Sequence, residues 1–106
     1  MKTGIELISE ERKEQIEKHN RSVLNDRRYN SELPYALTKA ASSLTAYPMS
    51  TVIIEFGRPE FWDKNIWERM CQKKYKERLI IAGALIAAEI DRVQTYESDG
   101  GTQSIK

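Results

Sequence analysis

The chain has 106 residues and a mass of 12.3 kDa, which is the size of one domain. Hydrophobic residues make up 40% and charged residues 31% of it, a balance that excludes an intrinsically disordered chain. Seventeen Lys and Arg face sixteen Asp and Glu, which argues against a general nucleic-acid coat protein. Because a single chain of this length buries only a modest hydrophobic core, we expect it to gain stability as a homo-oligomer.

Sequence features also point to a compartment. The single cysteine, Cys71, excludes an internal disulfide framework and a CxxC metal site, and it fits a reducing environment. The longest apolar run, residues 79–88, is about half as long as a membrane span. Glu6, Glu10 and Glu11 interrupt any apolar core of a signal peptide. We therefore expect a cytoplasmic protein without membrane contact.

The first half of the chain predicts two helices. Thr3 and Glu6 have the spacing of a capping box, which predicts a helix of about fifteen residues with a thin apolar stripe. Polar residues then predict a loop over 19–30. Asn30 or Ser31 can cap a second helix, which Tyr47-Pro48 ends. Its apolar residues recur at three- and four-residue spacing and are Leu33, Leu37, Ala40 and Leu44.

In the second half, residues 51–56 are β-branched and apolar and predict a loop or a short edge strand. Asp63 can cap a helical segment that reaches about Glu97 and can break near Gln72. Residues 79–90 are apolar almost all round, which predicts a buried central helix, and Gly83 within them indicates a close helix crossing.

The expected architecture is an all-α fold of three to four helices around a long, buried C-terminal helix. A single helical domain spans 1–97, and a polar tail spans 98–106.

The sequence holds few signals of catalysis. It has no Gly-rich phosphate loop, no Ser nucleophile elbow and no HExxH pair, so we predict no catalytic residues and no cofactor. One alternative is open: Glu11 and Glu14 lie three apart on one helix face and can chelate Mg²⁺. All-α nucleotide pyrophosphohydrolases of the MazG type pair such an ExxE with an ExxD on another helix, which this chain lacks.

Positive charge gathers in two segments. Basic residues crowd the first loop with only Asp26 against them, and residues 58–78 hold seven basic and four acidic residues. This grouping indicates a local anionic ligand rather than a long nucleic acid. Arginine forks match phosphate oxygens, and aromatic rings stack on bases. The predicted ligand-binding residues are Arg27, Arg28, Tyr29, His19, Trp62, Lys76 and Arg78.

Purely structural roles can also explain several of these predicted ligand-binding residues. A histidine at a helix end complements the helix dipole, which explains His19 without a ligand. Lys73, Lys74 and Lys76 also fit a solvated helix face, and Trp62 fits a core.

Three stretches resemble a family of small accessory proteins of tailed bacteriophages. They are Gly4-Ile5-Glu6-Leu7-Ile8 with Glu11-Arg12 and Gln15-Ile16-Glu17, the Pro59-Glu60-Phe61-Trp62 piece, and residues 82–92 with the sequence AGALIAAEIDR. The resemblance implies a non-structural phage protein. Where the family usually carries paired aspartates and a histidine, this chain has Asp26-Arg27-Arg28-Tyr29, a change that favours an anion over a metal.

The sequence therefore predicts an anti-defence protein that acts in the host cytosol. It would sequester a small nucleotide-derived ligand, such as an immune signal, without turnover. A Mg²⁺-dependent nucleotide pyrophosphohydrolase and a protein-binding inhibitor of a host enzyme are the alternatives.

Overall fold

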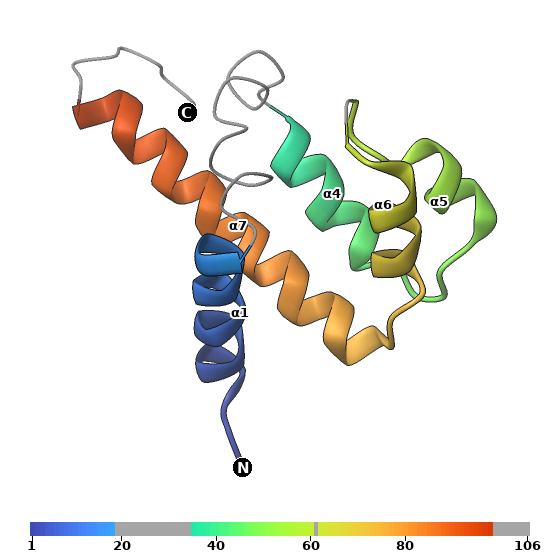
Figure 1. The fold of residues 1–106 in the computed structure, drawn as a ribbon, viewed down its shortest axis with the longest axis horizontal. Coiled ribbons are helices and arrows are strands. Elements are labelled where there is room, and N and C mark those ends of the chain that lie inside the picture. Colours follow the sequence, from blue (N-terminus) through green and yellow to red (C-terminus); the bar gives the residue numbers. More distant parts are fainter. Residues whose placement is uncertain (19–34, 61, 99–106) are drawn as a thin grey trace.

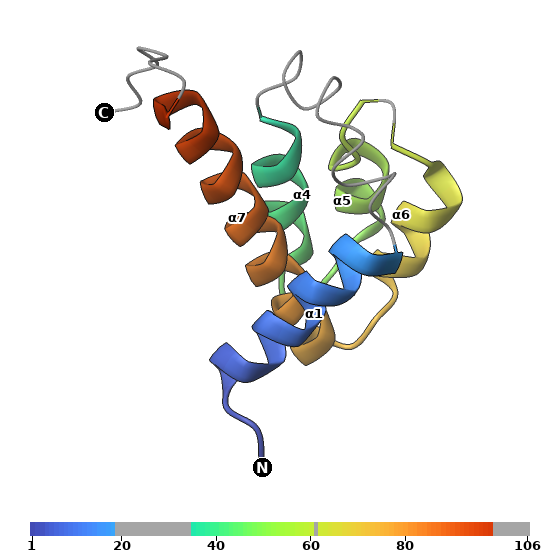
Figure 2. The same ribbon diagram turned by 60° about the vertical axis from the view of Figure 1, so that its left-hand side comes forward.

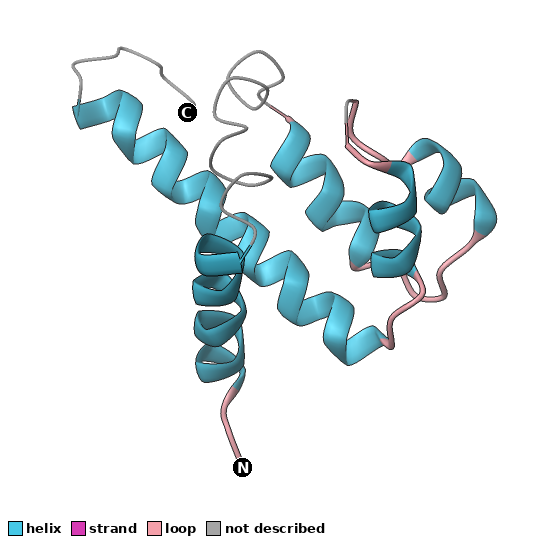
Figure 3. Ribbon diagram, viewed as in Figure 1, coloured by secondary structure: helices cyan, strands magenta, loops and turns pink. Residues whose placement is uncertain are grey.

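The computed structural model describes residues 1–18, 35–60 and 62–98, and within these ranges it is all-helical without a strand (Figures 1 and 3). The helices are α1 (Gly4–Lys18), α4 (Ala36–Leu44), α5 (Thr51–Phe56), α6 (Lys64–Cys71) and α7 (Tyr75–Ser98). The all-α prediction is confirmed. The described ranges hold five helices rather than three or four, because residues 51–56 form an additional one.

Local capping signals set the helix boundaries. The backbone N–H of Thr3 donates to Glu6 Oε1 at 2.7 Å and that of Glu6 donates to Thr3 Oγ1 at 3.2 Å, so the predicted capping box is confirmed. Asp63 Oδ1 accepts from the N–H of Ile66 at 2.8 Å and starts α6. The predicted break near Gln72 separates α6 from α7.

Helix α4 begins without such a signal. Its N-cap is Tyr35, whose side chain makes no capping bond. The caps predicted at Asn30 and Ser31 lie outside the described residues.

The predicted extended segment at 51–56 is wrong. These residues form α5, because the Ser50 hydroxyl accepts from the N–H of Ile53 at 3.2 Å and caps a helical turn. Ile54 packs against the core, whereas Val52 and Phe56 are exposed. A capped turn with one inward side chain satisfies its own backbone groups, which a lone strand cannot do.

The core lies where α4 and α6 meet α7. Figure 2 shows α4 and α7 side by side, running in opposite directions. Trp67 of α6 is fully buried, and its ring N–H donates to the carbonyl of Ile54 at 2.9 Å. The buried cluster is Leu37, Ala40, Ala41, Leu44, Trp67, Cys71, Ile81, Ala82, Leu85 and Ala88. Helices α4, α6 and α7 therefore share one core, and the Trp67 bond ties α5 to it.

Helix α1 crosses α7 at Gly83, as the glycine predicted. A Cβ atom built on Gly83 would lie 2.5 Å from Cδ1 of Ile8, closer than real Cβ atoms come to other atoms. Glycine thus lets the α1 backbone approach α7 at this point.

Helix α7 is the predicted long central helix and most of residues 79–90 are buried or half-buried, but its cover is not complete. Leu79, Ile86 and Ile90 are 39%, 47% and 52% exposed, because α1 and α4 cover only two sides of the helix. Even so, none of the helices in the described ranges combines the length and apolarity that crossing a bilayer requires.

Candidate functional site

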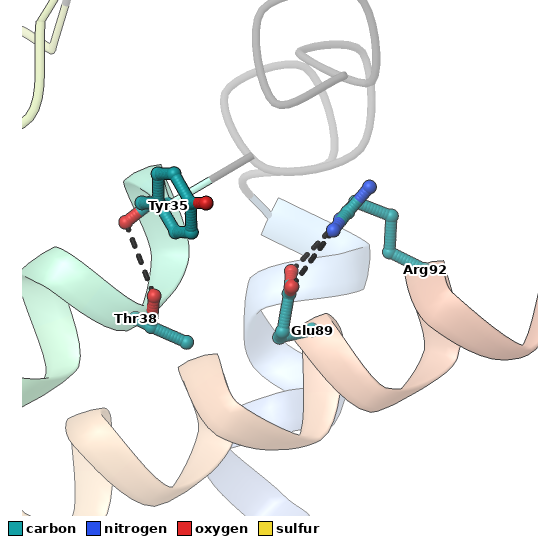
Figure 4. Close-up of polar contacts among 4 residues, drawn as sticks. All are labelled: Tyr35, Thr38, Glu89 and Arg92. Atoms are coloured by element: carbon teal, nitrogen blue, oxygen red, sulfur yellow. Dashed lines mark hydrogen bonds and ion pairs between the residues drawn. The ribbon is translucent and has the colours of Figure 1, made fainter. Parts of the chain in front are cut away.

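Four of the predicted ligand-binding residues, His19, Arg27, Arg28 and Tyr29, lie outside the described residues. The flanking Tyr35 is exposed at the start of α4, where its carbonyl accepts from the Thr38 hydroxyl at 3.2 Å (Figure 4). On α7, Arg92 donates to both carboxylate oxygens of Glu89 at 2.8 Å. This bidentate pair already occupies the donors of Arg92 that point along one edge of its guanidinium.

Arg78 does not face solvent, contrary to what the prediction of a ligand-binding role requires. Its side chain is buried, with 4% of its surface exposed. The guanidinium donates to the carbonyls of Lys73 at 3.0 Å, Leu44 at 2.9 Å and Ala46 at 2.6 Å. Leu44 ends α4, Ala46 follows it, and Lys73 lies in the turn before α7. Arg78 therefore joins α7 to the end of α4 rather than facing solvent.

A pair of tyrosine rings, Tyr47 and Tyr75, lies next to the Arg78 guanidinium. The centroids of Tyr47 and Tyr75 are 4.8 Å apart with the planes tilted by 44°, and Arg78 Cζ lies 5.4 Å from the Tyr75 centroid. Tyr47 is 76% exposed and Tyr75 is 38% exposed. The buried guanidinium therefore supports one ring, and that ring supports a second one that faces solvent.

Three exposed lysines adjoin this pair in the chain. Lys73 and Lys74 precede Tyr75, and Lys76 follows it. Within the described residues, none of the three ammonium groups is in an ion pair. We call these three lysines and the two tyrosines the tyrosine–lysine surface.

Lys76 and Tyr35 lie at opposite ends of the α4–α7 pair. Arg78, near the start of α7, contacts the end of α4 at Leu44, and the two helices run in opposite directions (Figure 2). Lys76 therefore lies at the Tyr75 end of the α4–α7 pair and not at the Tyr35 end.

Trp62 fits the core interpretation. Its ring meets that of Trp67 edge to face at 6.2 Å, and it packs against the buried cluster. The Trp62 carbonyl accepts from Arg58 Nη1 at 2.7 Å. These contacts hold the turn before α6.

The Glu11–Glu14 pair lies beside a polar contact between α1 and α7. Glu11 Oε2 accepts from Gln15 Nε2 at 3.1 Å, and Arg12 Nη2 donates to Asp91 Oδ2 at 2.9 Å. Across the described ranges, no group of three or more His, Cys, Asp or Glu side chains could hold a metal ion. The contact of Glu11 is thus internal to α1, whereas that of Arg12 joins α1 to α7.

Cys71 is a structural thiol. It belongs to the buried cluster, and burial raises its pKa to about 11 despite the opposing effect of the Arg78 charge. The neutral thiol is a poor nucleophile, so Cys71 is suited to packing rather than to catalysis.

Comparisons with protein-family models, with curated proteins and with solved structures find no match to this chain.

Proposed function

We propose that this protein is a non-catalytic binding protein for a small anionic ligand that carries an aromatic base. The carrying observation is the tyrosine–lysine surface, where three exposed lysines flank Tyr75 in the chain, make no ion pair within the described residues, and accompany a supported and exposed aromatic pair. A base stacks on an exposed ring, and ammonium groups attract phosphates. The surface thus presents both halves of the recognition that a nucleotide requires.

Support from the core makes the aromatic pair a suitable platform. Arg78 is held by three carbonyls and lies over the Tyr75 ring, so that ring has little freedom to lose when a ligand binds. Tyr47 offers most of its surface to solvent. Little of the binding free energy is then lost to ordering the aromatic pair when a ligand binds.

The resemblance to phage accessory proteins extends this proposal. On that basis the ligand is a nucleotide-derived immune signal of the host, and the protein removes it from circulation by binding it. Arg27, Arg28 and Tyr29 remain predicted contacts for the same class of ligand.

The test is equilibrium dialysis of the full chain against linear and cyclic diadenylates, with adenosine and inorganic phosphate as comparison probes. We expect the phosphorylated nucleotides to bind more tightly than either comparison probe and to be recovered unchanged in the presence of Mg²⁺. Tyr47→Ala and the double variant Lys73→Gln with Lys74→Gln should each weaken binding by about tenfold or more, since stacking on an aromatic ring contributes ~1–3 kcal/mol.

Matched controls come from the other end of α4. Tyr35 is 77% exposed, almost the same as Tyr47, and Lys39 is also exposed. Tyr35→Ala and Lys39→Gln should leave the affinity unchanged. Equal losses in Tyr35→Ala and Tyr47→Ala would overturn the location. Absence of nucleotide binding in the unaltered chain would overturn the function and favour a protein-binding inhibitor, with Val52 and Phe56 of α5 as its exposed apolar residues.

A further inference from the structure

Helix α1 lies outside the hydrophobic core that the other helices share. Among the described residues, the buried cluster and the half-buried side chains packed against it come from residues 37–88, and none comes from α1. Of the α1 side chains that the structure describes, only Gln15 is buried, and it is polar. Helix α1 therefore gains little of the apolar burial that stabilises α4, α6 and α7.

The polar contact between α1 and α7 is incompletely paired. Arg12 Nη2 donates to Asp91 Oδ2 at 2.9 Å, but Arg12 Nε, Arg12 Nη1 and Gln15 Oε1 are buried without a hydrogen-bond partner. In the described parts of the chain, all the buried side-chain nitrogen and oxygen atoms that lack a partner belong to these two residues of α1. Burial of an unpaired polar group costs free energy, which water returns when the group is exposed. Hydration of the three atoms would therefore offset part of the contacts that α1 loses on leaving α7.

One close apolar contact holds α1 across the middle of α7 (Figure 1). Ile8 rests on Gly83, where a Cβ atom would lie 2.5 Å from Ile8 Cδ1. This crossing also divides an apolar face of α7, because Leu79 lies four residues before Gly83 and Ile86 lies three residues after it. Departure of α1 would uncover Gly83 and join Leu79 and Ile86 into one continuous apolar strip.

We propose that α1 is a displaceable strap, which leaves α7 as a unit while the core of α4, α6 and α7 stays folded. Such openings of one element below the global unfolding transition are drawn from the elements with the fewest buried apolar contacts. Helix α1 has 15 residues, a length at which an isolated helix is marginally stable, so it unfolds when it leaves α7. The strap gives the chain a second state with an open apolar strip on α7. This inference does not depend on the proposed ligand.

Native-state hydrogen exchange of the full chain, followed by mass spectrometry, tests the strap. We expect the hydrogen-bonded amides of α1 to be protected at least tenfold less than those of α4 and of the middle of α7. Equal protection of α1 and α4 would overturn the proposal, because α1 would then open only together with the core.

A disulfide between α1 and α7 separates departure of α1 from fraying within it. A Cβ atom at residue 83 would lie 2.9 Å from Cγ1 and 3.4 Å from Cγ2 of Ile8, which suits the about 3.5–4.5 Å between the Cβ atoms of a disulfide. Oxidation of the double variant Ile8→Cys with Gly83→Cys should raise the protection of α1 to that of α4, and reduction should reverse the change. The unaltered chain, whose Cys71 is buried, is the control and should not respond. Unchanged exchange of α1 in the oxidised variant would overturn the proposal.

Two single variants should shift the equilibrium in opposite directions. Gly83→Leu fills the place of Ile8 and should lower the protection of α1 tenfold or more while that of α4 is kept. Gly4→Ala is its control, because a Cβ atom on Gly4 meets no atom within 4 Å. Gln15→Met removes the unpaired Oε1 and should raise the protection of α1 several-fold, whereas Gln94→Met on the exposed side of α7 should not. Loss of protection in α4 with Gly83→Leu, or in α1 with Gln15→Met, would contradict the proposal.

Discussion

Replacing Arg78 with methionine is expected to lower the free energy of unfolding by about 3–5 kcal/mol. Methionine retains much of the buried aliphatic stem, but it donates no hydrogen bond. The carbonyls of Lys73, Leu44 and Ala46 would each lose the guanidinium donor. The cost is large because the carbonyls lie at or beside the buried contact between α4 and α7, where water cannot readily replace the lost donor.

Urea unfolding followed by far-UV circular dichroism measures this loss. Arg69→Met is the matched control, since Arg69 is exposed on the neighbouring helix α6. Arg78→Lys should fall between the two, because one ammonium group cannot reproduce the planar fork of donors. Equal stabilities of Arg78→Met and Arg69→Met would contradict the structural role assigned to Arg78.

Replacing Trp67 with alanine should lower the free energy of unfolding by about 3–5 kcal/mol, the range typical of large aromatic side chains removed from cores. Trp67 is 0% exposed, and it belongs to the cluster that α4, α6 and α7 share. Its loss would also leave the carbonyl of Ile54 without its donor at 2.9 Å.

Trp67→Phe separates the two contributions in the same unfolding experiment. Phenylalanine refills most of the space but has no N–H, so a loss of about 1–3 kcal/mol is expected. Trp62 is only partly buried, and Trp62→Ala should cost less than Trp67→Ala. If Trp62→Ala costs as much or more, the core is centred elsewhere than this structure indicates.

Features with short-range causes were predictable from the sequence. Thr3 and Glu6 cap α1 through bonds that span three residues, and Asp63 caps α6 in the same manner. The close crossing of α1 and α7 was also predictable, because a glycine inside an apolar helix destabilises the helix unless a neighbouring helix approaches closely at that residue.

Features that depend on the cover supplied by other helices were not predictable. The β-branched residues at 51–56 favour a strand, but the Ser50 cap and the contact of Ile54 with the core outweigh that propensity. Residues 79–90 are apolar all round, and only the placement of α1 and α4 shows that Leu79, Ile86 and Ile90 stay exposed.

The site shows the same division. Arg78 stands among lysines in the sequence, and only its burial against carbonyls from residues 44 and 46 distinguishes it from them. Tyr47 carries no signal of its own, since its partner Tyr75 is distant in the chain. The run Lys73-Lys74-Tyr75-Lys76 was the available signal of the tyrosine–lysine surface, because it places an aromatic ring among cations.

Native mass spectrometry of the protein purified from infected or signal-producing cells, without added ligand, tests nucleotide binding most directly. The proposed function predicts a complex heavier than its polypeptide by a few hundred daltons per site, and release of a base-containing phosphate compound on denaturation. Tyr47→Ala purified in parallel should carry less of that compound, and Tyr35→Ala should carry as much as the unaltered chain. A mass that matches the polypeptide alone, with no such compound released, would contradict the central claim.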